Sequence, residues 1–96
     1  MIERQENRYF VSVPMLIANA RGLLQAGRDL LETETATEVV LDLAQVKDAD
    51  SSALGVLFGM LRTAAACGKA MRLANPPAGL ISQAALYGVS DSLPLA

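Results

Sequence analysis

The sequence contains no histidine, and its single cysteine is Cys67. A lone cysteine cannot form a disulfide within the chain, and without histidine a metal site would have to consist of carboxylates alone. The longest run of apolar residues and glycine, ALGVLFGML, ends at Arg62. A helix that spans a bilayer needs about 20 apolar residues, so we expect no direct insertion into a membrane. These absences favour a protein of the reducing cytoplasm.

Basic residues are also in short supply, because 8 lysines and arginines face 10 acidic residues for a net charge of −2. We therefore expect no nucleic-acid partner and no electrostatic binding to anionic lipid. The first ten residues, MIERQENRYF, lack the apolar segment of a signal peptide, which also favours a cytoplasmic location. With 96 residues, of which 52% are hydrophobic, the chain is expected to form a single domain over residues 1–96.

The hydrophobic pattern predicts three strands that alternate with three helices. The strands are short runs rich in β-branched or other apolar residues, at residues 8–13, 38–43 and 69–74. Each is followed by a segment with the spacing or end signals of a helix: residues 14–31, 51–68 and 75–88. Residues 89–96 are expected to form a turn and a few docking residues. The order predicts an α/β fold, with a mixed, mainly parallel sheet of about four strands, residues 39–43 at its centre, and helices packed against it.

Two adjacent serines, Ser51 and Ser52, stand where the second strand ends and the second helix begins. The simplest interpretation makes Ser51 the N-cap of the helix. A catalytic serine is disfavoured, because the chain has neither a histidine base nor a Gly-x-Ser-x-Gly elbow. We therefore predict no catalytic residues and no enzymatic activity.

Three carboxylates, Asp42, Asp48 and Asp50, lie near the same turn. Carboxylates can hold a magnesium ion, but we interpret these residues as polar loop residues that keep the turn soluble. The nearest approach to a phosphate-binding loop, ACGKAM, lacks the first glycine and the final Ser or Thr of that motif. The sequence therefore predicts no metal and no cofactor.

One side of the second helix carries small and apolar residues in place of charges. If Leu54, Leu57 and Phe58 face the sheet, the helical rotation of 100° per residue places a strip of other residues on the outward side of the helix. Its members are Ser52, Val56, Gly59, Met60, Thr63 and Cys67. Gly55 and Gly59 each cost about 1 kcal/mol relative to alanine inside a helix. Close packing within the domain and the close approach of a partner backbone are both open explanations, and we interpret the strip as a contact surface.

The run DADSSALGVLFGML, between an apolar strand and the strand KAMRLAN, resembles the STAS domain. This is the fold of bacterial anti-sigma-factor antagonists and of accessory subunits of some transporters. The resemblance covers residues 8–90, with Ala53 at a position where family members commonly have glycine. In the antagonists a partner kinase phosphorylates the first serine of the Asp-Ser-Ser triplet, so the resemblance implies that Ser51 is a phosphorylation site.

The short chain and its ending, ALYGVSDSLPLA, are similar to the MlaB-type STAS subunits of Mla phospholipid ABC transporters. This resemblance implies a binding module, peripheral to the inner membrane, that docks on the transporter ATPase and serves outer-membrane lipid asymmetry. From this resemblance and the helix pattern, we expect the residues that bind the partner to be Asp50, Ser51, Ser52, Val56, Gly59, Met60 and Thr63. The alternative is an anti-sigma-factor antagonist whose partner is an anti-sigma factor with serine kinase activity. An exposed apolar strip would also allow weak homodimerisation.

Overall fold

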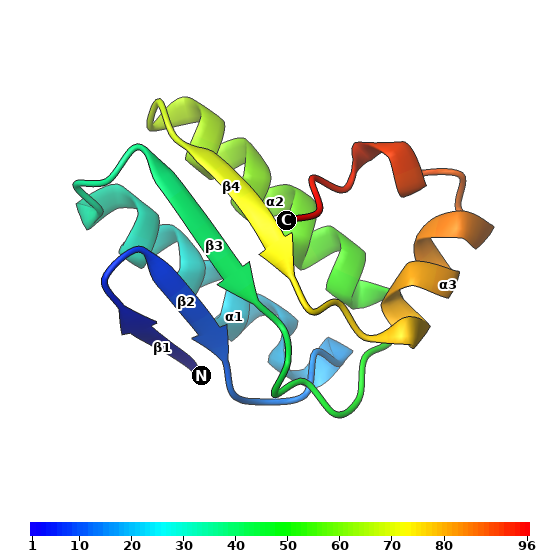
Figure 1. The fold of residues 1–96 in the computed structure, drawn as a ribbon. Helices are drawn as coiled ribbons and strands as arrows, with labels where there is room; N and C mark the ends of the chain where they lie inside the picture. Colours follow the sequence, from blue (N-terminus) through cyan, green and yellow to red (C-terminus); the bar gives the residue numbers. More distant parts are fainter.

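The computed structural model describes residues 1–96 as a four-stranded sheet with three α-helices (Figure 1). The strands are β1 (Ile2–Gln5), β2 (Arg8–Val11), β3 (Glu38–Asp42) and β4 (Ala70–Ala74). The helices are α1 (Ile17–Thr33), α2 (Ser52–Ala66) and α3 (Ala78–Leu86), followed by a short 3₁₀ helix, η1 (Ser90–Ser92). The sheet order is β1-β2-β3-β4, with β1 antiparallel to β2 and the other two pairs parallel. The predicted mixed, mainly parallel α/β fold is confirmed, and β3 is an interior strand as expected.

The sequence pattern did not predict β1. Its residues are mostly charged or polar and exposed, and only Ile2 packs against the core. The strand forms because β2 offers it an antiparallel partner across a tight turn at Glu6, which has a positive φ of 55°. A charged edge strand of this kind carries little hydrophobic signal and is typical of protected sheet edges.

Helices α1 and α2 lie side by side on one face of the sheet (Figure 1). Alternate strand residues point toward them and are buried, among them Tyr9, Leu41 and Leu73. Residues of opposite parity, such as Arg8 and Arg72, point to the other face, which no helix covers in Figure 1. Helix α3 lies at the end of the molecule where β3 and β4 finish.

The expectation that α2 presents an outward apolar strip is wrong for its central residues. Val56 is 4% exposed, Met60 is 1% exposed, and Gly59 is also buried. The reason is that α2 packs on the sheet with one side and on α1 with the next, and it also contacts α3. A sequence pattern shows which residues are apolar but not how many elements cover them.

The two helices approach closely at glycines. A Cβ added at Gly27 of α1 would lie 2.5 Å from Cε of Met60, and one added at Gly59 would lie 2.7 Å from Cδ1 of Leu24. Close packing within the domain therefore explains Gly59. It does not explain Gly55, where an added Cβ would meet no atom within 4 Å.

The last residues dock on the outer edge of β4, as predicted for the tail. The N–H of Leu73 donates to the carbonyl of Pro94 and the N–H of Ala96 donates to the carbonyl of Leu73, both at 2.8 Å. Leu93 is buried. The segment between α3 and this tail thereby acquires a fixed position beside α2.

Candidate functional site

Asp50 holds the turn that leads into α2. Its Oδ1 accepts the N–H of Ser52 at 2.9 Å and also the hydroxyl of Ser52. Its Oδ2 accepts the N–H of Ile17, the first residue of α1, at 3.0 Å. One carboxylate therefore satisfies first-turn amides of two helices, which is the task of an N-cap.

These hydrogen bonds lower the pKa of Asp50 below its ordinary value of 3.8. The largest cause is the bond from the Ser52 side chain, followed by the bond from the backbone N–H of Ile17. Asp50 is therefore ionised at neutral pH, in the form that accepts all three bonds.

Ser51 does not cap the helix, contrary to the simplest interpretation of the sequence. Its side chain makes no capping hydrogen bond, its backbone is already helical (φ −62°, ψ −20°), and the residue is exposed. Because Asp50 does the capping, the hydroxyl of Ser51 is free to contact another molecule.

An apolar groove opens beside Ser51, between α2 and the segment that follows α3. It has a volume of about 350 Å³ and is lined by Ser51, Leu54, Phe58, Tyr87 and Val89. Of these residues, Leu54 is buried, Phe58 is half-buried, and Tyr87 is 59% exposed. The free hydroxyl thus stands next to a hydrophobic concavity.

The predicted partner-binding residues divide into two groups. Asp50, Ser51 and Ser52 lie together at the start of α2 and are at least partly accessible. The members farther along the helix, Val56, Gly59 and Met60, are buried, and Gly59 and Met60 lie in the contact with α1. Thr63 is half-buried in the same contact, where its hydroxyl accepts a 3.3 Å hydrogen bond from Nε of Arg28. The structure therefore assembles only the first group at the surface.

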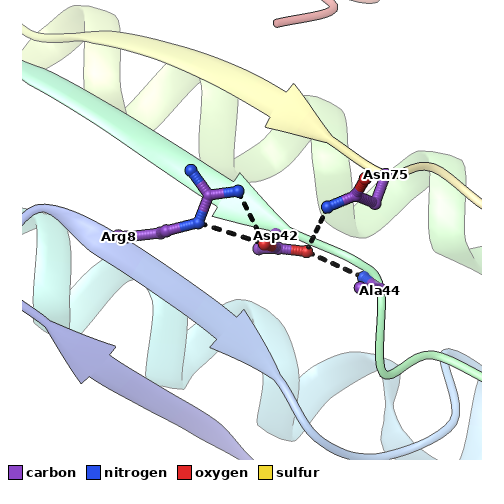
Figure 2. A network of polar contacts seen from close by, with 4 residues as sticks. All are labelled: Arg8, Asp42, Ala44 and Asn75. Carbon is purple, nitrogen blue, oxygen red and sulfur yellow. Dashed lines mark hydrogen bonds and ion pairs between the residues drawn. The ribbon is translucent and has the colours of Figure 1, made fainter.

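A second carboxylate, Asp42, organises the end of the sheet (Figure 2). Its Oδ2 accepts from Nε and Nη2 of Arg8 at 3.0 and 2.7 Å. Its Oδ1 accepts from the backbone N–H of Ala44 at 2.9 Å and from Nδ2 of Asn75 at 3.0 Å. Asp42 therefore links β2, the loop after β3 and the loop after β4.

Burial of Asp42 by itself raises the pKa of its carboxyl group. The hydrogen bonds from Asn75, Ala44 and Arg8 outweigh that effect, so the pKa is lowered below its ordinary value of 3.8. The interpretation of Asp42 as a solvated loop residue is wrong, because it is 4% exposed and fully hydrogen-bonded. Asn75 uses its side chain in this network, and α3 begins after Pro77 with no side-chain cap.

No three acidic or cysteine side chains lie close enough together to hold a metal ion. Asp42 and Asp50 instead take part in separate hydrogen-bond networks. None of the helices is both long and apolar enough to cross a membrane.

A model of the family described as "Mlab, STAS domain" matches residues 11–95. The chain belongs to the STAS family. STAS domains are in general binding modules that act through partner proteins. No curated protein matches the sequence.

Solved structures show the same fold as this STAS domain. A Thermotoga maritima protein designated a candidate anti-sigma factor antagonist is similar with a TM-score of 0.77 and 18% identity, covering 99% of this chain and 83% of that one. The anti-sigma factor antagonist SpoIIAA in its unphosphorylated form has a TM-score of 0.73 and 14% identity, covering 100% and 86%. A sulfate transporter family protein from Wolinella succinogenes has a TM-score of 0.70 and 17% identity, covering 91% and 70%. At these identities the likeness concerns the fold alone.

The far wall of the groove was not predicted from the sequence. Tyr87 and Val89 flank Gly88, whose positive φ of 69° turns the chain after α3. The sequence did predict a helix end at this glycine. It contained no signal for the packing of that end against the first turns of α2, which depends on how the STAS domain folds as a whole.

Proposed function

We propose that this STAS domain is a non-enzymatic docking module that binds the ATPase subunit of a Mla-type phospholipid ABC transporter. The contact surface is the start of α2, with Asp50, Ser51 and Ser52, together with the adjoining groove. The observation that carries the proposal is the exposed hydroxyl of Ser51, which has no role in capping its own helix. The description of the matching family model supports the choice of transporter.

Binding explains the features of this surface better than catalysis does. The hydroxyl of Ser51 has no side-chain base beside it, and the sequence has no histidine to provide one. A rigid serine at the rim of an apolar groove is instead typical of a recognition surface, in which a polar group fixes the orientation of an apolar contact. The bonds of Asp50 to both helices provide the rigidity.

The proposal can be tested by co-expressing the protein with the ATPase subunit of the transporter and measuring co-purification. We expect Ser51→Arg to reduce recovery of the complex at least tenfold while the isolated domain keeps its Tm, because Ser51 is exposed and unbonded. Thr35→Arg, an equivalent change at an exposed residue after α1, should leave recovery unchanged. Absence of a complex with the wild type, or full recovery of Ser51→Arg, would contradict the proposal.

The same exposed hydroxyl also favours the second candidate function, an anti-sigma-factor antagonist controlled by phosphorylation of Ser51. A phosphate on Ser51 would be stabilised by the partial positive charge at the N-terminal end of α2 and would be repelled by the neighbouring Asp48 and Asp50. Mass spectrometry of the peptide that contains Ser51, after isolation from the native cells, separates the two functions. Phosphoserine together with an anti-sigma factor among the bound proteins would establish the second, and unmodified Ser51 with bound ATPase the first.

A further inference from the structure

The groove beside Ser51 has the dimensions of a short helix-binding site. Ser51, directly before α2, and Leu54 and Phe58 of α2 have the spacing i, i+3 and i+7 and form one wall about 10 Å long. Tyr87 and Val89 form the other wall. Two turns of a partner helix, with side chains at the same spacing, match such a length.

A small molecule is a poor fit. Small-molecule sites range from about 300 to 1,000 Å³ and enclose most of the ligand. This groove, at about 350 Å³, is lined by only five residues and is open to solvent along its length. It can accept one or two side chains of a protein but cannot surround a whole ligand.

Gly55 lies next to the groove, one helical turn after Ser51. It is exposed, and an added Cβ would meet no atom within 4 Å. Glycine is unfavourable inside a helix relative to alanine, and nothing within the domain offsets that cost. The missing side chain leaves room for the backbone of a partner helix to approach α2 closely.

Charges around the groove select the occupant. Asp48 and Asp50 lie just before Ser51, Lys47 precedes them, and Asp91 lies two residues after Val89, so acidic residues outnumber basic ones three to one in these segments. No charged residue occurs from Leu73 to Ser90, and the nearest cation on α2 is Arg62, one turn beyond Phe58. An occupant with basic residues beside its apolar ones therefore complements this rim.

The same acidic residues disfavour a second copy of the chain as the occupant of the groove. In a symmetric dimer both subunits use the same patch, so each acidic rim would face the other one. Repulsion between Asp48, Asp50 and Asp91 of the two copies would oppose such a contact.

We propose that the groove between α2 and the end of α3 binds an amphipathic helix of a different protein, one that carries lysine or arginine beside two or three apolar residues. The helix inserts an apolar side chain between Phe58 and Tyr87, passes close to Gly55 and places a basic side chain near Asp91. This inference rests on the proposed function in one respect, that the start of α2 is the partner surface.

The direct test introduces the photo-reactive residue p-benzoylphenylalanine in place of Tyr87, in the full chain and in its native cells. The matched control carries it in place of Gly79, which is exposed in the first turn of α3, about 12 Å along the helix. After irradiation, the attached peptide is identified by mass spectrometry. We expect adducts at position 87, not at position 79, within an amphipathic helical segment that contains lysine or arginine.

The outcomes are distinguishable. If the attached segment is a basic amphipathic helix of a transporter ATPase, both the inference and the proposed function stand. If it is a basic amphipathic helix of another protein, the inference stands and the proposed function falls. Adducts with a second copy of the chain, with an acidic or non-helical segment, or no adduct specific to position 87 would overturn the inference.

Two substitutions test the close approach of the partner helix at Gly55 and the contribution of the negative charge of Asp91. The binding partner in these measurements is the protein identified by cross-linking. Gly55→Gln should weaken binding at least tenfold, whereas Gly79→Gln, also a helical glycine with open space around it, should not. Asp91→Lys should weaken binding more at low than at high salt, whereas Glu32→Lys, the same charge change on α1, should have no effect. Unchanged binding of Gly55→Gln and Asp91→Lys would contradict the proposed helix.

Discussion

At the scale of single residues, Asp50 joins the first turns of α1 and α2. Its two oxygens accept hydrogen bonds from Ile17 and Ser52. Ser51, its neighbour in the chain, makes no such contact and faces solvent. Adjacent polar residues therefore have separate tasks, since Asp50 stabilises the fold and Ser51 is available to a partner.

This division predicts the effects of two alanine substitutions on thermal stability. We expect Asp50→Ala to lower Tm by about 4 °C or more, because it removes an N-cap shared by two helices. Ser51→Ala should change Tm by less than about 2 °C, because no intramolecular bond is lost. Thermal unfolding followed by circular dichroism provides the measurement, and Asp50→Asn, which keeps a capping side chain, serves as the control. Equal losses for Asp50→Ala and Ser51→Ala would show that Ser51 also caps the helix.

At the scale of elements, α2 is covered by several neighbours. The sheet covers one side, α1 covers the next, and α3 contacts the helix as well. The exposed residues of the helix are Gly55, Arg62, Ala65 and Ala66, and Ser51 is exposed just before its first turn. Met60 belongs to the contact with α1 and packs directly over Gly27.

A charge at Met60 should therefore destabilise the domain itself. Met60 is 1% exposed, so Met60→Asp places a carboxylate in the buried α1–α2 contact. We expect a loss of roughly 3–5 kcal/mol in the free energy of unfolding, measured by urea denaturation. Ala66→Asp, at an exposed position near the end of α2, is the control and should have little effect. A wild-type unfolding curve for Met60→Asp would mean that α1 does not cover this side of α2.

The two helical glycines at positions 27 and 55 should respond to alanine with opposite signs. Gly27→Ala brings a methyl group within 2.5–3.0 Å of three side-chain atoms of buried Met60, and overpacking of this kind costs about 1–3 kcal/mol. We expect that loss to exceed the gain of roughly 1 kcal/mol in helix propensity, because Met60 is 1% exposed and its packed side chain has little room to move aside. Gly55→Ala meets no atom and should raise stability by about 0.5–1 kcal/mol.

Urea denaturation of both variants checks this prediction. A smaller residue at position 60, as in Met60→Val, should reduce the cost of Gly27→Ala, because the clash would be relieved. Stabilisation by Gly27→Ala in the wild-type background would contradict the close contact of the helices.

At the scale of the whole molecule, three carboxylates hold distant segments together. Asp42 links β2 to the loops after β3 and β4, and Asp50 links α1 to α2. Glu34, after α1, accepts the hydroxyl of buried Tyr9 at 2.7 Å and the N–H of Ala36 at 3.0 Å. The pKa of each carboxyl group is lowered, for Glu34 chiefly by the backbone hydrogen bond from Ala36.

These shifts predict how stability depends on pH. A carboxyl group with a lowered pKa in the folded state binds its proton more readily in the unfolded state, so its contribution is complete above the ordinary pKa and is lost as pH falls. The ordinary values are 3.8 for Asp and 4.5 for Glu34. We expect Tm to be nearly constant from pH 7 to about pH 5 and to fall steeply below about pH 4.

Asp42→Asn should lower Tm at pH 7, because it weakens the bonds to Arg8, and should also make the decline in acid shallower. Lys47→Gln, at an exposed residue outside all three networks, is the control and should follow the wild-type curve. A Tm that stays constant down to pH 3 would show that these carboxylates do not stabilise the fold.

The sequence by itself determined most of the secondary structure and the family. Apolar spacing located α1 and α2, start and end signals located α3, and short apolar runs located β2, β3 and β4, all to within a few residues, because these signals reflect the local geometry of each element. The triplet Asp50-Ser51-Ser52 and the helix after it indicated the STAS family. Strand β1 escaped detection, because a polar edge strand depends on its partner and not on its own hydrophobicity.

The tertiary structure decided which apolar surfaces are covered and which polar groups are free. The sequence could not show that Val56 and Met60 are buried, because periodicity separates the faces of a helix without counting its neighbours. Nor could it assign the N-cap to Asp50 in place of Ser51, since both residue types cap helices and the choice follows from backbone geometry and from the position of Ile17. The groove between Phe58 and Tyr87 joins segments that only folding brings together.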